Sequence, residues 1–166
     1  EEALRRRRVA PGLLRLGLFG DGARSDFVVT RWKDTDEEKW KRVVEKCLED
    51  VLPGPSRSLF ASDKNPSAVA LAKRDCLRAG VASDIRLDNR EVGDVVASTA
   101  FDAVVSNPPW GKRVTGAEEA WSDLGQWLKR SARCAGLLCG DPPLSRELRL
   151  RAKRKVKLNH AGDDLT

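Results

Sequence analysis

The residues best suited to chemistry follow a short apolar run at residues 101–105. An Asn-Pro-Pro-Trp motif comes one residue after it, at residues 107–110. The two prolines restrict the backbone, so the Asn107 amide and the Pro108 carbonyl are held with little freedom. Two such acceptors beside a flat indole suit a planar substrate with an exocyclic amine, whose ring would stack on Trp110. The alternative is an ordinary strand-to-loop junction with a packing tryptophan.

A second candidate site residue is Asp63, which ends the apolar segment 58–63. A polar turn and an Ala-rich helix, expected over residues 67–78, come after it. In doubly wound sheets, an acid at the carboxyl end of the second strand accepts hydrogen bonds from both ribose hydroxyls of a nucleotide. The alternative is that Asp63 only caps the following helix.

Several elements are needed to position these residues. The run at 101–105 has the length and β-branched content of a strand buried on both faces of a parallel sheet. An amphipathic helix of about four turns is predicted, with N-cap candidates at residues 34–38, an apolar series from Trp40 to Val51 and its Trp and Val stripe in the core. Another helix is predicted from Ala117 to Cys134, which packs on the sheet and has on one face Trp121, Leu124, Trp127, Leu128 and Ser131. The remaining predictions are a loop at 13–26, an extended piece at 27–32, a strand at 135–140, a short helix at 144–150 and an edge strand at 155–158. Alternating strands and helices predict an α/β fold with a largely parallel sheet.

The composition of the chain limits the class of protein that it can belong to and the partners that it can bind. The chain has 166 residues with 31 Lys and Arg against 25 Asp and Glu, a net charge of +6 that mildly favours a polyanionic partner. Four cysteines without a paired frame and one histidine, His160, predict reduced thiols, an intracellular protein and no zinc site. Apolar runs are too short to cross a membrane. The arginines at 5–8 are interpreted as a solvated helix end, with a nucleic-acid contact or a targeting remnant as alternatives.

Two motifs carry a resemblance to a known family. Asn107-Pro108-Pro109-Trp110 resembles the Asn/Asp-Pro-Pro-aromatic motif of S-adenosylmethionine-dependent methyltransferases that act on amino or amide nitrogens. With Gly111-Lys112-Arg113 after it, the motif resembles the guanine-N2 RNA enzymes more than the adenine-N6 DNA enzymes. Residues 61–81 resemble the second cofactor motif of the same methyltransferases.

The resemblance extends over nearly the whole chain. Residues 1–4 resemble the end of the helix that follows the glycine-rich cofactor loop, and residues 155–162 look like the family's closing hairpin. Residues 10–40 are similar to an insertion in the bacterial-type large-subunit ribosomal RNA guanine-N2 methyltransferases, which favours ribosomal RNA over transfer RNA.

The resemblance implies a fold and a domain organisation. We expect a Rossmann-like class I methyltransferase sheet that is incomplete at the N-terminus, because the first strand, its glycine-rich loop and an RNA-binding THUMP domain would precede Glu1. Residues 1–166 would form a partial catalytic domain, with an insertion at 13–57 and core elements at 58–166.

The resemblance also implies a site. Asn107, Pro108, Pro109 and Trp110 would orient and stack the base, and Asp63 would hold the ribose of S-adenosylmethionine. The family spacing places the adenine contact on Glu91, with Asp88, Asn89 and Asp94 as alternatives. Lys112 and Arg113 would contact RNA phosphates.

Partners and alternatives follow from these assignments. We expect a monomer that binds RNA, needs no metal or membrane, and works in the cytoplasm or in an organelle such as the chloroplast. One alternative is a non-catalytic RNA-binding remnant of the fold. Another keeps the chemistry but acts on adenine N6 or on a glutamine amide.

Overall fold

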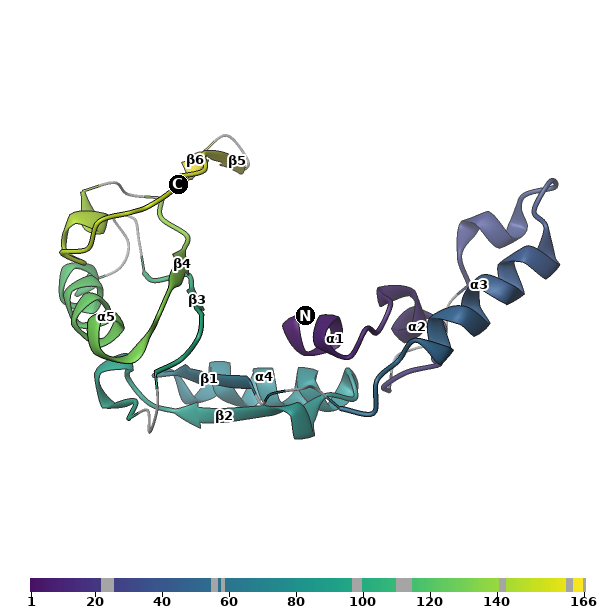
Figure 1. Cartoon of the computed structure of the whole chain (residues 1–166), viewed down its shortest axis with the longest axis horizontal. Helices are drawn as coiled ribbons and strands as arrows, with labels where there is room; N and C mark the ends of the chain where they lie inside the picture. Colours follow the sequence, from purple (N-terminus) through teal and green to yellow (C-terminus); the bar gives the residue numbers. More distant parts are fainter. Residues whose placement is uncertain are drawn as a thin grey trace. The chain divides into compact units, whose positions relative to one another are not determined.

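The computed structural model describes residues 1–21, 26–54, 57, 59–96, 100–109, 115–140, 143–160 and 163–165. The chain divides into two compact units, Glu1–Arg90 and Glu91–Thr166, which we describe separately (Figure 1). None of the helices in these described ranges is both long and apolar enough to cross a membrane. The same ranges contain no cluster of three or more potential metal ligands.

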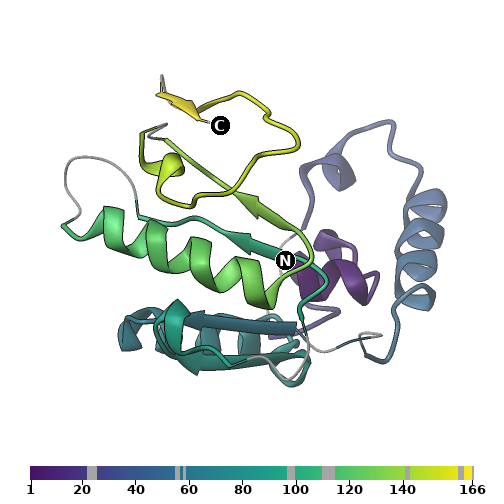
Figure 2. The same cartoon turned by 60° about the vertical axis from the view of Figure 1, so that its left-hand side comes forward.

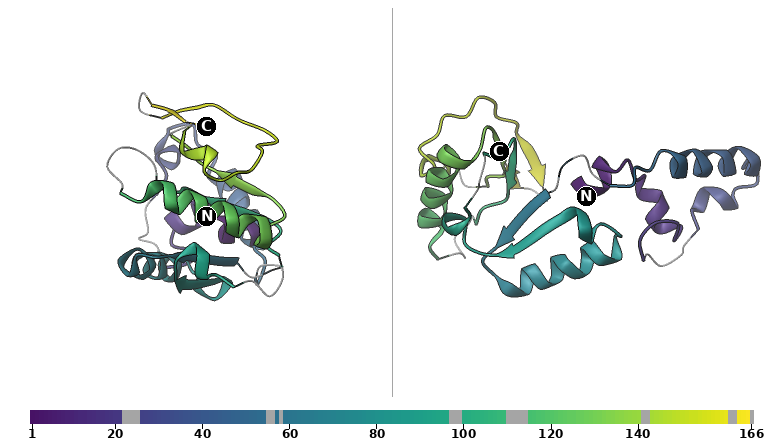
Figure 3. Two further views of the ribbon diagram at one scale, coloured as in Figure 1. Left: turned by 90° about the vertical axis from the view of Figure 1, so that its left-hand side faces the viewer. Right: turned by 60° about the horizontal axis from the view of Figure 1, so that its bottom comes forward.

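The first unit is built on a β-α-β element. Strands β1 (Leu59–Asp63) and β2 (Ile85–Asn89) pair in parallel, with Asp63 opposite Asn89. Helix α4 (Pro66–Arg78) connects them through η2 (Ala82–Asp84) and packs along the pair (Figures 2 and 3). The cap of α4 is Asn65, whose side chain accepts a hydrogen bond from the Ser67 amide at 2.9 Å. The interpretation of Asp63 as the helix cap is therefore wrong.

The N-terminal part of this unit contains α1 (Glu2–Arg6), α2 (Pro11–Arg15), η1 (Val28–Arg31) and α3 (Glu37–Glu49). Two predictions here need correction. The loop expected at residues 13–26 is wrong for its first three residues, which belong to α2 because the fixed φ of Pro11 suits a first helical position, whereas residues 16–21 form turns and bends. The segment expected to be extended forms the 3₁₀ helix η1, whose turn is closed by the Thr30 hydroxyl donating to the Phe27 carbonyl at 2.7 Å.

The arginines at 5–8 are also not simply a solvated helix end. Arg7 Nε donates to the Leu52 carbonyl at 3.0 Å, and its Nη1 donates to the Gly80 carbonyl at 3.2 Å. Arg7 thus links α1 to the end of α3 and to the turn after α4.

Helix α3 confirms the predicted helix, but not the burial of its apolar stripe. Val43 and Leu48 are 49% and 39% exposed, and no residue of α3 is buried. The ring of Trp40 meets the edge of Phe27 at 5.5 Å between centroids, and α2 supplies a further contact. Phe27 and α2 together cover only part of the apolar stripe, so Val43 and Leu48 stay exposed.

The second unit contains η3 (Val92–Asp94), β3 (Val104–Ser106), α5 (Ala117–Ser131), β4 (Ala135–Leu137) and η4 (Leu144–Arg146). Strands β3 and β4 pair in parallel, and α5, which connects them, runs alongside (Figure 2). An antiparallel hairpin of β5 (Leu158–His160) and β6 (Asp163–Leu165) closes the unit. The short helix expected at 144–150 is only the 3₁₀ turn η4, and the edge strand begins at Leu158 rather than at Lys155.

The core of the second unit lies on one face of α5. Burial confirms the predicted face, with its members Trp121, Leu124, Trp127, Leu128 and Ser131 all buried. The prediction that the 101–105 strand is buried on both faces is wrong, because Val105 is 88% exposed. Side chains alternate along a strand, so Val104 lies on the covered face of β3 and Val105 on the open one. The α/β class with parallel strands is confirmed.

Candidate functional site

The Asn-Pro-Pro tip directly follows β3. Asn107 is exposed, Pro108 is buried and Pro109 is half-buried, so the tip rests on a proline that is packed into the unit. The Leu138 amide donates to the Ser106 carbonyl at 3.1 Å, which ties the last residue before the tip to the chain leaving β4. The tip therefore lies at the carboxyl edge of the β3–β4 pair, the usual place for ligand contacts in parallel sheets.

Helix α5 holds this tip from behind. Trp121, which is 0% exposed, donates its Nε1 hydrogen to the Pro109 carbonyl at 2.7 Å. This bond fixes the second proline and so limits the directions in which Asn107 and the Pro108 carbonyl can point. Sequence reasoning placed Trp121 in the core but missed this positioning role. A buried tryptophan needs an acceptor for its N–H, and this need was the available signal.

The rest of the tip lies outside the described residues. Trp110, which was expected to stack on the base, and Lys112 and Arg113, which were expected to contact phosphate, all belong to the segment 110–114. Their roles stay predictions.

Asp63 ends β1 with an exposed side chain on a fixed backbone. Its Oδ1 accepts a hydrogen bond from the Asn65 amide at 2.7 Å, which closes a tight turn ahead of α4. Its carbonyl accepts from the Asn89 side chain at 2.9 Å and from the Arg90 amide at 3.1 Å. Asn89 also donates to the Lys64 carbonyl at 2.9 Å, so the end of β2 clamps the turn after β1. A carboxylate held in this way can accept hydrogen bonds from a vicinal diol.

The two candidate acids for the adenine amine differ in their surroundings. Asp88 lies within β2 and pairs with Arg86 at 3.0 Å and with Arg90 at 3.6 Å. Glu91 lies two residues after the end of this strand, directly precedes η3 and is exposed. An acid engaged by two guanidinium groups is less available to an incoming amine, so the local geometry favours Glu91.

The candidate residues fall into two sets. Asp63 and Asp88 belong to the first unit, whereas Glu91, Asn107 and the two prolines belong to the second. Asp63 ends β1, Asp88 and Glu91 lie at or just after the end of β2, and the Asn107 tip follows β3, so each candidate lies near the carboxyl end of a parallel strand. Asp63, Asp88 and Glu91 carry acceptors suited to a nucleoside, and the Asn107 tip carries acceptors suited to an amine.

Solved structures share this arrangement of elements. SMU.472, described as a methyltransferase in complex with SAH, matches with a TM-score of 0.82 and 19% identity, over 96% of this chain and 41% of that one. A protein from Listeria monocytogenes, described as an N6-adenine-specific DNA methylase, matches with a TM-score of 0.76 and 19% identity, over 98% and 40% of the two chains. The fold is that of a class I methyltransferase.

Sequence comparisons assign the chain to a family within this fold. The family described as "RMKL-like, methyltransferase domain" matches residues 1–165, and the chain belongs to it. The Ribosomal RNA large subunit methyltransferase K/L of Shewanella amazonensis is 31% identical over 166 residues, which cover 95% of this chain and 22% of that protein. The corresponding protein of Shewanella frigidimarina is 27% identical with the same coverage. The chain thus spans about a fifth of the length of these relatives.

Proposed function

We propose that this chain is part of an enzyme that transfers a methyl group from S-adenosylmethionine to N2 of a guanine in RNA, with large-subunit ribosomal RNA as the substrate. The observation that carries the proposal is the Asn107-Pro108-Pro109 tip at the carboxyl edge of β3–β4, fixed by Trp121. The family and the relatives named for ribosomal RNA methylation support the RNA.

The role proposed for the tip is to position the substrate amine. The Asn107 side-chain oxygen and the Pro108 carbonyl would accept the two hydrogens of the amine, which turns the nitrogen lone pair toward the incoming methyl group. A fixed pair of acceptors removes rotational freedom that the reactants would otherwise lose in the transition state. Trp110 would stack the flipped base.

The residues near the strand ends fit the cofactor. S-adenosylmethionine would supply an electrophilic methyl group when bound. Asp63 offers a carboxylate to the ribose hydroxyls, on a backbone clamped by Asn89. Glu91 is proposed for the adenine amine, because Asp88 is engaged by Arg86 and Arg90.

The cellular setting follows from the relatives. They are bacterial, which favours the cytoplasm, and nothing in the comparisons supports the chloroplast. Lys112 and Arg113 are proposed as phosphate contacts, and the monomeric state stays a prediction.

Replacing the tip amide tests the proposal in the full-length protein that contains this chain. We expect Asn107→Ala to lower kcat for methyl transfer to large-subunit ribosomal RNA by about 100-fold or more, because one of the two acceptors is lost. Asn107→Asp is the matched control, since it keeps an oxygen in the same place and should retain part of the activity.

Three outcomes separate the proposal from its alternatives. Full methyl transfer by Asn107→Ala would contradict the assignment of the tip. Binding of RNA without binding of S-adenosylmethionine by the unsubstituted protein would support a non-catalytic RNA-binding module. Methyl groups recovered on adenine N6 or on a glutamine amide would keep the chemistry and change the substrate.

A further inference from the structure

The excess positive charge of the chain is concentrated in one segment. Residues 149–157, which we call the basic segment, contain six Lys or Arg and no acid, namely Arg149, Arg151, Lys153, Arg154, Lys155 and Lys157. The whole chain has 31 basic and 25 acidic residues, so outside the segment 25 basic residues face 25 acidic ones. The net charge of +6 is therefore the charge of the basic segment.

These cations are open to a partner. Every residue from Arg149 to Lys157 is exposed. Among the residues that the structure describes, none of the six basic side chains takes part in an ion pair or a hydrogen bond. A solvated charge run on a helix face usually has acidic neighbours that moderate its field, and this segment has none within it.

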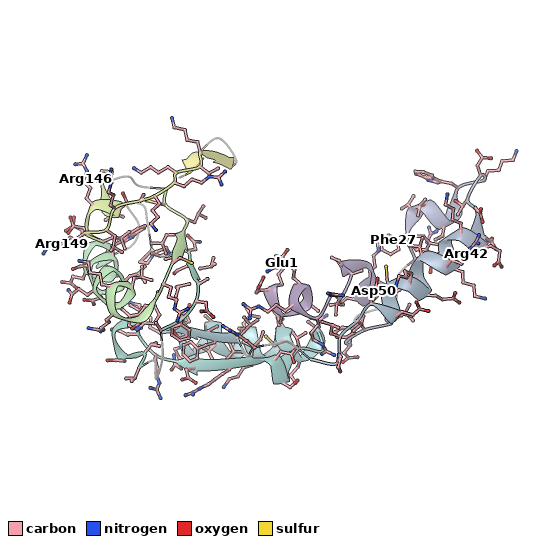
Figure 4. All side chains as sticks on the ribbon, viewed as in Figure 1. Glu1, Phe27, Arg42, Asp50, Arg146 and Arg149 are labelled. Carbon is pink, nitrogen blue, oxygen red and sulfur yellow. The ribbon has the colours of Figure 1, made fainter. Side chains whose placement is uncertain are left out.

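The residue just before the basic segment, Leu148, packs tightly against α5. Leu148 is buried, and a Cβ added at Gly125 would lie 2.3 Å from the Leu148 carbonyl oxygen and 2.7 Å from its Cα. Only a glycine lets the two backbones approach so closely. Arg149 then has a φ of 50°, a left-handed conformation that turns the chain directly after this contact. Arg146 and Arg149 lie beside α5 (Figure 4).

The face of α5 that contacts Leu148 also holds the Asn107-Pro108-Pro109 tip. Trp121 bonds the Pro109 carbonyl, and Gly125 lies one turn further along α5, at the spacing that places two residues on one face. The chain that leads to the basic segment also leaves β4 at the edge of the sheet where the tip leaves β3. One helix thus sets the positions of both the amine-binding tip and the start of the basic segment.

We propose that the basic segment binds the phosphate backbone of the RNA strand whose base enters the tip. An extended segment of nine residues reaches up to about 30 Å, which is enough to follow several successive phosphates. Phosphate contacts of this kind set the register of a nucleic acid without reading its sequence. The inference rests on the proposed function for the identity of the polyanion, and it adds contacts beyond Lys112 and Arg113.

The test compares two charge-matched variants of the full-length protein that contains this chain. The first is K153Q/R154Q/K155Q, and the control is K33Q/K39Q/K41Q, which removes three exposed positive charges near and on α3. Affinity for a large-subunit ribosomal RNA transcript is measured across a salt series. Each lost phosphate contact to a single strand lowers the slope of log affinity against log salt by about 0.7. We expect the slope to fall by about 2 for the first variant and to stay unchanged for the control.

Methyl transfer and cofactor binding are measured on the same preparations. An unchanged salt slope in K153Q/R154Q/K155Q overturns the inference, and equal losses in both variants overturn it too, since binding would then follow total charge. Methyl transfer to RNA by the unsubstituted protein in either case leaves the proposed function standing. RNA binding that depends on the basic segment in a protein that methylates no RNA would instead refute the proposed function and keep the inference.

Discussion

At the scale of single residues, Glu2 is the acid with the clearest electrostatic environment. Its carboxylate accepts hydrogen bonds from Arg5 Nε at 2.7 Å and from Arg6 Nε at 2.8 Å, one turn along α1. These hydrogen bonds, first that from Arg5 and second that from Arg6 in size of effect, lower the pKa of Glu2 from 4.5 to about 2. Because the folded-state pKa lies below the ordinary value, these bonds stabilise α1 above about pH 4.5 and are lost as the pH falls toward 2.

This environment predicts the titration of Glu2. An NMR titration of its side-chain carboxyl should give a midpoint of about 2, and R5Q/R6Q should return the midpoint toward 4.5. The group is exposed, so added salt should also raise the midpoint in the unsubstituted protein. A midpoint near 4.5 without substitution would show that the ion pairs do not persist in solution.

At the scale of elements, α5 carries two tryptophans with the same local chemistry. Trp121 donates to the Pro109 carbonyl and Trp127 donates to the Val95 carbonyl, both at 2.7 Å and both from the buried face. The first bond holds the tip, and the second holds the segment after η3. Trp121 is therefore expected to act on the candidate site, whereas Trp127 is expected to act only on the packing of the unit.

Substituting each tryptophan tests this separation. Trp121→Phe and Trp127→Phe each leave a carbonyl without its donor, which should lower the free energy of unfolding by about 1–3 kcal/mol. Only Trp121→Phe should also lower kcat, by up to about 100-fold, because the tip loses its support. Denaturant unfolding and single-turnover methyl transfer are the measurements. Equal losses of kcat in the two variants would assign Trp121 to packing alone.

At the scale of the whole molecule, the candidate site residues are divided between two units. Asp63 in the first unit carries the acceptor proposed for the ribose, and Asn107 in the second carries the acceptor proposed for the amine. Substitution of Asp63 should therefore affect cofactor binding, and substitution of Asn107 should affect base positioning.

Asp63→Asn tests this division of labour. Loss of the charge weakens hydrogen bonds to two hydroxyls, so we expect the affinity for S-adenosylmethionine to fall about 10- to 100-fold while RNA affinity stays unchanged. Calorimetry with the cofactor and a separate RNA-binding assay are the measurements. Asp75→Asn, which removes an exposed acid paired with Arg74 on α4, is the control. An equal loss of cofactor affinity in both variants would contradict the assignment of Asp63.

Much of the local structure could be predicted from the sequence because local backbone rules decide it. The prolines at 108 and 109 end a strand, and Asn65-Pro66 begins a helix, whatever the rest of the chain does. The buried face of α5 and the strands near Asp63 and Asn107 followed from periodicity in the same way. The errors fell on short elements, α2 and η1, whose few residues carry no periodicity that would separate a helical turn from a loop or an extended piece.

The sequence by itself determined the α/β class, the alternation of strands and helices along the chain and the motif residues, since these depend on neighbours along the chain. Only the tertiary structure decided that Trp121 supports Pro109, that Gly125 receives Leu148, and that Val105 and the α3 stripe stay exposed. These facts depend on contacts between segments far apart in sequence, and no periodicity encodes which surface will meet which. The charge of the basic segment can be read from the sequence, but the packing of Leu148 on Gly125, which sets where the segment begins, comes only from the tertiary structure.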